Sequence, residues 1–195
     1  MIQANVQHCK TLEDFYTSIR AQQEAAHGKD YCGHHDAIKR LIQENELTSY
    51  KELGTHQGAT AAAALLSKMI RRACLIDIKF DIFEPQEPLF DTFCQTNGIE
   101  LNCKCIDSSS PQSLDGKRYD IMLIDSLHKP AHMKKELAVH SETVNHFIVA
   151  HDTSKPSDSL FHALKDFVAS NHKKWSILER NTTNVGYTIL KRVAK

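Results

Sequence analysis

Segments whose apolar positions recur at helical spacing alternate along this chain with short, densely apolar runs. Two helices are predicted first, over about residues 10–28 and 34–46, before a short strand within YKEL. A small-residue helix is predicted from Ala59 to about Arg72, and a second strand region follows within CLIDIKFDIFEP. PLFDTFCQTNG predicts a helix that ends at Gly98, because glycine is favoured just past a helix end.

The second half of the chain continues the alternation. IELNCKCID predicts a third strand, and the continuous apolar runs YDIMLID and NHFIVAHDT are typical of strands buried on both faces. AHMKKELAVHSETV and DSLFHALKDFVASN predict helices, and WSILER and GYTILKR predict two closing strands joined by the polar turn NTTNV. Strands that alternate with helices imply βαβ units and a mostly parallel sheet covered on both faces, whereas two strands joined by a short turn must be antiparallel.

The composition narrows the class of protein. The 195 residues carry no formal net charge, with 41% hydrophobic and 25% charged residues, so no overall field draws the chain to nucleic acid or to a membrane surface. The N-terminal sequence lacks the apolar core of a signal peptide, and no apolar stretch reaches the roughly 18 residues of a membrane span. Six scattered cysteines suit reduced thiols. We therefore expect a cytoplasmic, single-domain protein.

Most of the twelve histidines lie in polar contexts and are interpreted as surface residues. GHHDAIKRL, at residues 33–41, is interpreted as a helix start rather than as a cluster of metal ligands, because Asp36 favours the positive end of a helix. CKC, at residues 103–105, has the wrong spacing for a zinc knuckle. The sequence alone therefore predicts no histidine- or cysteine-based metal site in these segments.

Acidic side chains follow each predicted parallel strand, and the carboxyl ends of such strands are where open sheets bind ligands. The first strand ends at Glu52 and leads into the loop Gly54–Gly58, which lacks the Lys-Ser/Thr pair of a nucleoside triphosphate P-loop. Later strand ends supply a larger set: Asp81, Glu84, Asp107, Ser108, Asp125, His151 and Asp152. An acid after the second strand suits a ribose; Asp81 is the first choice there and Glu84 the second.

Asp125, His151 and Asp152 are expected to converge, because they end strands that are predicted neighbours at the centre of the sheet. Two carboxylates and an imidazole can hold a hard divalent ion or share a proton, and a hydrogen-bonded polar cluster is the alternative. His128 follows Asp125 closely and is either a member of the same cavity or a surface residue.

YKELGTHQGATAAAALL, YDIMLIDSLHKPAHMKKEL, FIVAHDT and WSILERNTTNVGYTILKR together resemble class I S-adenosylmethionine-dependent methyltransferases. Within that class they are most similar to small-molecule O-methyltransferases related to cephalosporin-hydroxylase and macrocin-type enzymes. The resemblance covers about residues 48–192 and implies a Rossmann-like three-layer α/β/α sandwich whose mostly parallel sheet ends in an antiparallel hairpin. Residues 48–195 would form this core, and residues 1–47 a helical segment that is a candidate lid over it.

The resemblance also implies roles for individual residues. Glu52, Gly54, Thr55 and Gly58 would line the methionine part of S-adenosylmethionine, Asp81 or Glu84 would bind the ribose, and Asp107 with Ser108 would lie near the adenine. Asp125, His128 and His151 would be the catalytic residues, and Asp125 and Asp152 candidate ligands of a divalent ion such as Mg²⁺. Ser126 and Leu127 depart from the glycine–acid pair of the relatives, and His151 replaces an acid, which leaves the metal open.

The expected activity is methyl transfer to a small hydroxylated molecule, in EC class 2.1.1. A catalytically inactive methyltransferase-like binding module and a metal-dependent hydrolase that uses Asp125, His151 and Asp152 are the alternatives. No nucleic acid or membrane partner is expected. The acceptor, the catalytic competence and the oligomeric state, with a homo-oligomer among the options, stay open from the sequence alone.

Overall fold

The protein, described by a computed structural model over residues 3–154 and 158–193, is built on one mixed sheet of seven strands. The strands are β1 (Ser49–Leu53), β2 (Arg72–Asp77), β3 (Glu100–Cys105), β4 (Tyr119–Ile124), β5 (Val144–His151), β6 (Trp175–Asn181) and β7 (Tyr187–Arg192). The helices are α1 (Leu12–His27), α2 (Gly33–Glu44), α3 (Ala59–Leu65), α4 (Glu87–Asn97), α5 (Pro130–His140) and α6 (Ser159–Ser170). Three short 3₁₀ turns lie at Glu84–Gln86, Pro111–Ser113 and Ser141–Thr143.

The strand order is β3-β2-β1-β4-β5-β7-β6, and the first five of these strands run parallel. β7 pairs antiparallel with both β5 and β6, so the predicted closing hairpin is confirmed, with β7 inserted next to the parallel strands. This order reverses direction between β1 and β4, and open sheets bind ligands at such a switch point. A ligand site is therefore expected at the carboxyl ends of β1 and β4.

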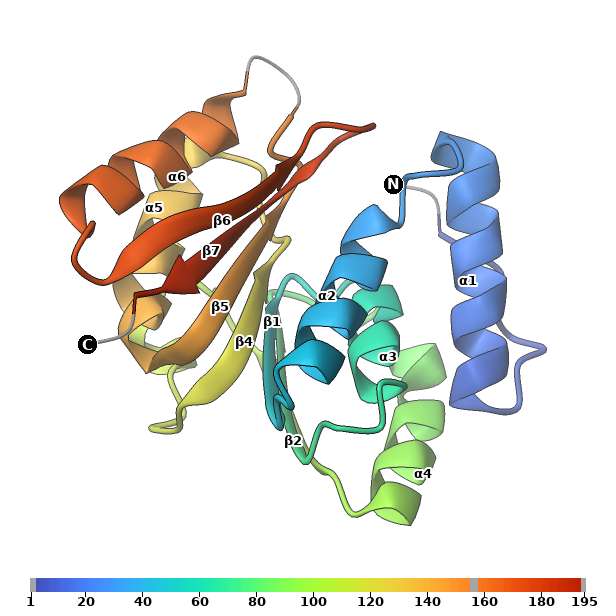
Figure 1. Ribbon diagram of the computed structural model, residues 1–195. Coiled ribbons are helices and arrows are strands. Elements are labelled where there is room, and N and C mark those ends of the chain that lie inside the picture. The colour runs from blue at the N-terminus through green and yellow to red at the C-terminus, as the bar shows by residue number, and fades with distance from the viewer. Residues whose placement is uncertain (1–2, 155–157, 194–195) are drawn as a thin grey trace.

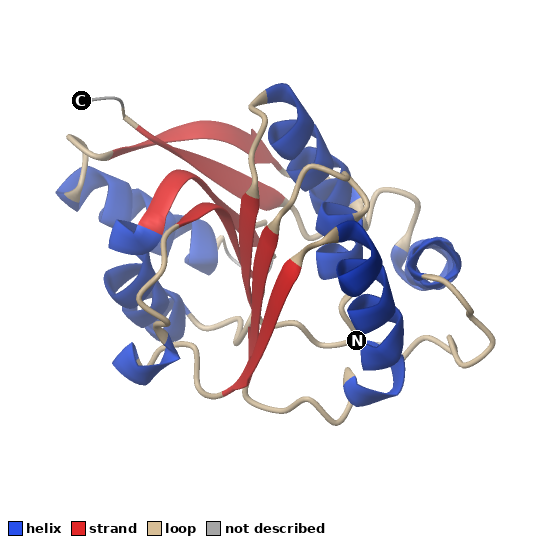
Figure 2. Cartoon of the chain, turned by 90° about the horizontal axis from the view of Figure 1, so that it is seen from below, coloured by secondary structure: helices blue, strands red, loops and turns tan. Residues whose placement is uncertain are grey.

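The helices cover the two faces of the sheet in separate groups (Figure 1). α1 to α4 pack on one face and α5 with α6 on the other, and Figure 2 shows the sheet between the two helical layers. The continuous apolar run of β4 is fully buried because helices cover both its faces. The predicted three-layer α/β/α architecture is confirmed.

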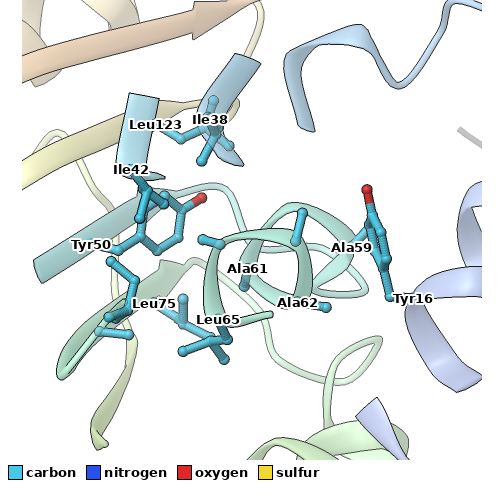
Figure 3. Close-up of a cluster of buried hydrophobic side chains, with 14 of the residues drawn as sticks. Tyr16, Ile38, Ile42, Tyr50, Ala59, Ala61, Ala62, Leu65, Leu75 and Leu123 are labelled. Atoms are coloured by element: carbon cyan, nitrogen blue, oxygen red, sulfur yellow. The ribbon is translucent and has the colours of Figure 1, made fainter. Parts of the chain in front are cut away.

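The alanine-rich helix α3 lies close against the sheet, and all seven of its residues are buried. Figure 3 shows Ala61 and Leu65 of this helix on the side that faces Tyr50 and Leu75 of the sheet. Small side chains let the helix axis approach the strands and leave room for large neighbours, which matches the dense packing of protein interiors. α3 therefore fixes the loop that joins β1 to it.

Two predicted boundaries in this region are wrong. The helix predicted to reach Arg72 ends at Leu65, and Lys68 adopts a left-handed backbone (φ +63°) before β2 begins. The second strand ends at Asp77 and does not continue through the KFD sequence. Its pairing with β1 ends at Ile76, opposite Leu53, and its pairing with β3 ends at Asp77, opposite Cys105. The ends of its two neighbours therefore match the end of β2.

No helix within residues 3–154 and 158–193 is both long and apolar enough to cross a membrane.

Candidate functional site

A cavity of about 400 Å³ opens at the carboxyl ends of β1, β2 and β4, where the strand order reverses. Its size falls within the roughly 300–1,000 Å³ of small-molecule sites. The residues that line it come from the loops after β1, β2, β3 and β4: Gly54, His56, Asp77, Ile78, Asp107, Ser108, Asp125, Ser126, Leu127 and His132. Ile78 and Leu127 are exposed apolar side chains in this set, and Asp77, Asp107 and Asp125 are its acids.

A second, much smaller cavity of about 30 Å³ shares Gly54, His56 and Asp125 with the larger one. Core residues Glu52, Thr55, Thr60 and His151 contribute to it, and so do Gln23, Tyr31, His34 and His35 from the N-terminal segment. The two cavities therefore meet at Asp125, and the N-terminal helices close the narrower one.

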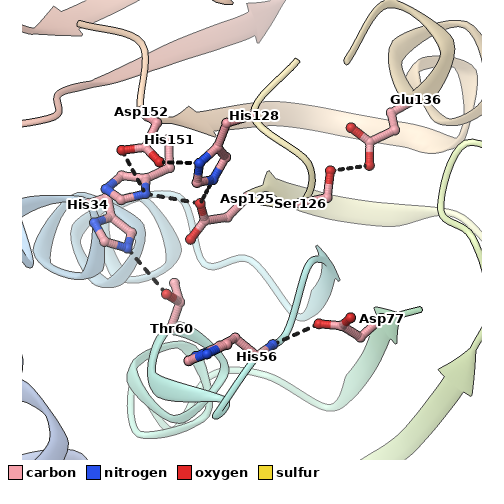
Figure 4. Close-up of polar contacts among 10 residues, drawn as sticks. All are labelled: His34, His56, Thr60, Asp77, Asp125, Ser126, His128, Glu136, His151 and Asp152. Carbon is pink, nitrogen blue, oxygen red and sulfur yellow. Dashed lines mark hydrogen bonds and ion pairs between the residues drawn. The ribbon is translucent and has the colours of Figure 1, made fainter. Parts of the chain in front are cut away.

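Asp77 is the acid that the second strand delivers to the cavity. It is the last residue of β2, and its Oδ2 accepts a 2.8 Å hydrogen bond from the backbone N–H of His56, in the loop after β1 (Figure 4). The sequence prediction chose Asp81 and Glu84 instead. Both are exposed, lie beyond the true strand end and are absent from the residues that line the larger cavity.

The glycines of the loop after β1 allow close approach, but the approaching groups belong to the chain itself. A Cβ on Gly54 would lie 2.3 Å from the carbonyl oxygen of Asp125, and one on Gly58 would lie 2.8 Å from the rings of Phe83 and Phe90. Gly54 lines both cavities, whereas Gly58 lines neither and begins α3 in a left-handed conformation (φ +84°). The structure thus gives Gly58 a packing role, and its predicted position beside a cofactor stays a prediction.

Glu52 points into the smaller cavity and is almost completely buried. Burial raises its pKa well above the ordinary value, although the hydroxyl of Tyr50 donates a hydrogen bond to its Oε2. A neutral carboxylic acid can donate a hydrogen bond as well as accept one. Glu52 is therefore better suited to a polar neutral partner than to the cofactor ammonium.

Asp125, His151 and Asp152 converge as predicted, and His128, which the sequence left open, belongs to the same cluster. His128 bridges the two carboxylates, with its Nε2 3.3 Å from Asp125 Oδ1 and its Nδ1 2.8 Å from Asp152 Oδ2. His151 Nδ1 lies 3.0 Å from the same Asp125 oxygen, as the dashed lines of Figure 4 show. Asp152 holds a left-handed backbone (φ +57°), a strained conformation of the kind that clusters at functional sites.

The cluster is strongly polarised. Hydrogen bonds to Asp125 and Asp152 raise the pKa of His128 to about 10, so its ring is an imidazolium at neutral pH. Burial favours neutral His151, but the charge of Asp125 outweighs it and raises the pKa. Burial opposes the charge of Asp125 as well, yet His151 and His128 leave its pKa well below the ordinary range. Two carboxylates and two histidines thus form one network of hydrogen bonds and ion pairs.

Ser108 and Ser126 line the larger cavity with their hydroxyls committed to Glu136 of α5. The two Oγ atoms donate to Glu136 Oε1 at 2.5 and 2.6 Å. Each hydroxyl proton is thereby used, so only oxygen lone pairs remain for a ligand. Ser108 therefore lies where it was predicted to contact a ligand, as does the exposed Asp107, which also caps the backbone of Ser109 at 2.8 Å.

Sequence reasoning missed Asp77 and His34. The sequence feature that could have identified Asp77 is its position directly after the apolar run ACLI, where a strand would end. His34 was interpreted as part of a helix start, which is correct, but α2 also places its ring on His151. Helical periodicity alone gives no sign of that contact.

Comparison with known proteins identifies the fold. No protein-family model matches the sequence, and no curated protein matches it. Solved structures do match. TomG, an O-methyltransferase of tomaymycin synthesis from Streptomyces achromogenes in complex with S-adenosylmethionine, superimposes with a TM-score of 0.65 at 12% identity, covering 92% of this chain and 90% of its own.

Two further structures agree. An O-methyltransferase from Bacillus cereus in complex with S-adenosylhomocysteine gives a TM-score of 0.61 at 12% identity, over 100% of this chain and 93% of the other. The S-adenosylhomocysteine-bound methyltransferase PaMTH1 from Podospora anserina gives 0.60 at 11% identity, over 83% and 78%. At such identities the likeness is one of fold.

Proposed function

From this class I methyltransferase fold, we propose that the chain binds S-adenosylmethionine in the larger cavity and methylates a small hydroxylated molecule. The observation that carries the proposal is the position of Asp77. It ends β2 at the rim of a cavity of about 400 Å³ located at the switch point of the sheet. A carboxylate at this position suits the two hydroxyls of a ribose.

The remaining cavity residues fit the other parts of the cofactor. Ile78 and Leu127 offer apolar surface for a flat base, and the lone pairs of Ser108 and Ser126 suit an exocyclic amine. Gly54, His56 and Asp125 would take the methionine end, where the two cavities meet. Glu52 and Thr55 would face the acceptor, because both line the smaller cavity.

S-adenosylmethionine supplies an electrophilic methyl group on a sulfonium, so the chain needs mainly to align the acceptor oxygen and to manage its proton. Asp125 lies at the junction of the cavities, with His128 and His151 hydrogen-bonded to it. Either ring can accept the acceptor's proton once it has lost its own. Because both pKa values are raised, the rate should increase as the pH rises above neutrality.

Mg²⁺ fits this cluster poorly. Mg²⁺ requires near-octahedral oxygen coordination at about 2.0–2.1 Å. Asp125 and Asp152 supply oxygens, but the cationic ring of His128 already lies between them, and His151 replaces a third carboxylate. His128 thus provides at this place the positive charge that a hard ion would bring, so the reaction is proposed here without an Mg²⁺-dependent step.

The acceptor is proposed to be small and polar. The space beyond Asp125 is about 30 Å³ and is lined by hydroxyl, carboxyl and imidazole groups. Tyr31 and Gln23 of the N-terminal segment close it, so an acceptor larger than a few atoms would have to displace this segment. This supports the role of residues 1–47 as a lid, and neither nucleic acid nor a membrane surface is proposed as a partner.

Calorimetric titration with S-adenosylmethionine tests the binding site. Asp77→Asn should weaken binding by about tenfold or more, since hydrogen bonds to a charged group contribute about 1.5–3 kcal/mol. Asp81→Asn is the matched control, an acid four positions along the chain in the same loop region, and should leave the affinity unchanged. If only Asp81→Asn weakens binding, Asp81 rather than Asp77 binds the ribose, as the sequence predicted.

Turnover is tested separately, with radiolabelled cofactor and a panel of hydroxylated acceptors. Methyl transfer to one of them supports the enzyme. Binding of the cofactor with no transfer to any member of the panel favours the inactive binding module. If the protein does not bind the cofactor but hydrolyses a substrate, the metal-dependent hydrolase is favoured, which the cluster of Asp125, His151 and Asp152 also allows.

A further inference from the structure

His34 of α2 packs its ring on His151 of β5. The ring centroids lie 3.8 Å apart with an interplanar angle of 33°, and Figure 4 shows the two rings one above the other beside Asp125. Both histidines are nearly inaccessible to solvent, with 3% and 4% of their surface exposed. One ligand atom from each of His34, Asp125 and His151 lies within 4.8 Å of the others. Two imidazoles and one carboxylate therefore lie close together at the ends of β4 and β5.

Within the described residues, His34 has one nitrogen whose hydrogen-bonding capacity is unused. Its Nε2 lies 3.3 Å from the hydroxyl of Thr60, whereas its Nδ1 is buried without a partner. An unsatisfied buried polar atom destabilises the folded state. A bound ligand would offset this cost, and in the tautomer whose Nδ1 carries no hydrogen that ligand is one that accepts an electron pair from the ring nitrogen.

We propose that His34, Asp125 and His151 bind a transition-metal ion of the Zn²⁺ and Co²⁺ class. Imidazole nitrogen is a preferred ligand of these borderline ions, whereas Mg²⁺ and Ca²⁺ prefer oxygen. The donor set thus matches one chemical class and opposes the other. The consequence of the ion for catalysis rests on the proposed methyl transfer, because Asp125 serves both sites, but binding itself does not depend on that function.

Binding has a structural consequence for α2. A metal lies in the plane of each ligating ring, at about 2.0–2.1 Å from nitrogen. Two stacked rings 3.8 Å apart must turn away from each other before both can direct a nitrogen at one ion. Because His34 is the second residue of α2, this rotation links metal occupancy to the position of the N-terminal segment. The ion is therefore expected to secure that segment to the core.

The test uses the full chain, free of tags and stripped with a chelator. Zn²⁺ titrations are followed by calorimetry, and Co²⁺ titrations by visible absorption. We expect one equivalent to bind, about tenfold or more weaker binding in His34→Gln, and no displacement by a large excess of Mg²⁺. Zn²⁺ should also raise the melting temperature of the wild-type chain more than that of His34→Gln.

His35→Gln is the matched control. His35 is the next residue of the same helix, is equally buried and also has an unpartnered Nδ1, yet among the described residues it does not belong to the three-residue group. Any of three outcomes would overturn the proposal: His35→Gln loses as much Zn²⁺ affinity as His34→Gln, His34→Gln keeps the wild-type affinity, or the wild type does not bind Zn²⁺.

A gain-of-preference variant keeps the test informative if His34→Gln does not fold. His151→Asp replaces a nitrogen ligand with oxygen and should shift the preference from Zn²⁺ towards Mg²⁺ by about tenfold or more. An unchanged ratio of affinities would contradict the assigned ligand set. S-adenosylmethionine titrations of the His34 and His35 variants should give wild-type affinity, so failure of the metal site can be distinguished from failure of the proposed cofactor site.

Discussion

Gly54→Ala tests whether the contact between the ends of β1 and β4 builds the site. The added Cβ would lie 2.3 Å from the carbonyl oxygen of Asp125 and 2.6 Å from Ser126 Cα, both backbone atoms that cannot move aside alone. The backbone at Gly54 is also left-handed, with φ at +91°. The left-handed conformation costs a residue with a Cβ about 1–2 kcal/mol, and overpacking adds about 1–3 kcal/mol. We expect a loss of about 2–5 kcal/mol in the free energy of unfolding.

Gly98→Ala separates the two contributions. Gly98 is also left-handed, with φ at +64°, but a Cβ added there would have no atom of the described residues within 4 Å. Gly98→Ala should therefore lower the free energy of unfolding only by the cost of the left-handed backbone, about 1–2 kcal/mol. Urea unfolding of both variants, followed by circular dichroism, gives the difference directly. If Gly54→Ala is no less stable than Gly98→Ala, the close approach of Asp125 is not what requires glycine at that position.

Three further predictions concern buried or paired charges and are measured by unfolding at a series of pH values. The pKa of His128 is raised to about 10 from about 6.5 in the unfolded chain. The stabilisation from its charge is therefore complete below about pH 6.5 and is lost as the pH rises towards 10. His128→Gln should remove this pH dependence and lower the free energy of unfolding by about 1 kcal/mol at pH 7, after allowance for solvent screening. Burial raises the pKa of Glu52, so the wild type should lose stability as the pH rises above about 4.3, and Glu52→Gln should flatten that decline. Lys51 is buried, and its Nζ has no hydrogen-bond partner among the described residues, although it lies 4.8 Å from the centre of the Tyr119 ring. Burial lowers the pKa of Lys51, so Lys51→Met should gain about 1 kcal/mol at pH 7 and lose the rise in stability that the wild type shows on approach to about pH 10.4. An unchanged pH profile in any of these variants would contradict the charge state assigned to that side chain.

Local sequence patterns were enough to predict most of the architecture. The apolar runs of β4 and β5 predict buried strands because each has helices on both sides, and Gly98 predicts the end of α4 because it adopts the left-handed conformation there. The short turn between β6 and β7 predicts their antiparallel pairing, which is confirmed. In each case the sequence pattern that carries the prediction is local.

The site was harder to predict because tertiary contacts decide its details. Asp77 faces the cavity because the pairing of β2 with β3 ends at that residue, opposite Cys105, whereas a sequence run of alternating polarity continues beyond it. His34 reaches His151 because α2 docks over the end of β5, a contact between distant parts of the chain. The cluster at Asp125 was predictable, since parallel strand ends share one edge of the sheet.

The docking of α2 also affects how the protein is made. The helix leaves the ribosome before any strand of the sheet, and its apolar face (Ile38, Leu41 and Ile42) is buried in a cluster formed with later elements, from α3 to β5. Contacts between such distant segments slow folding, and exposed apolar surface favours aggregation in the meantime. Nascent chains should therefore depend on chaperones until β5 has been synthesised, and truncations that end before this strand should be insoluble.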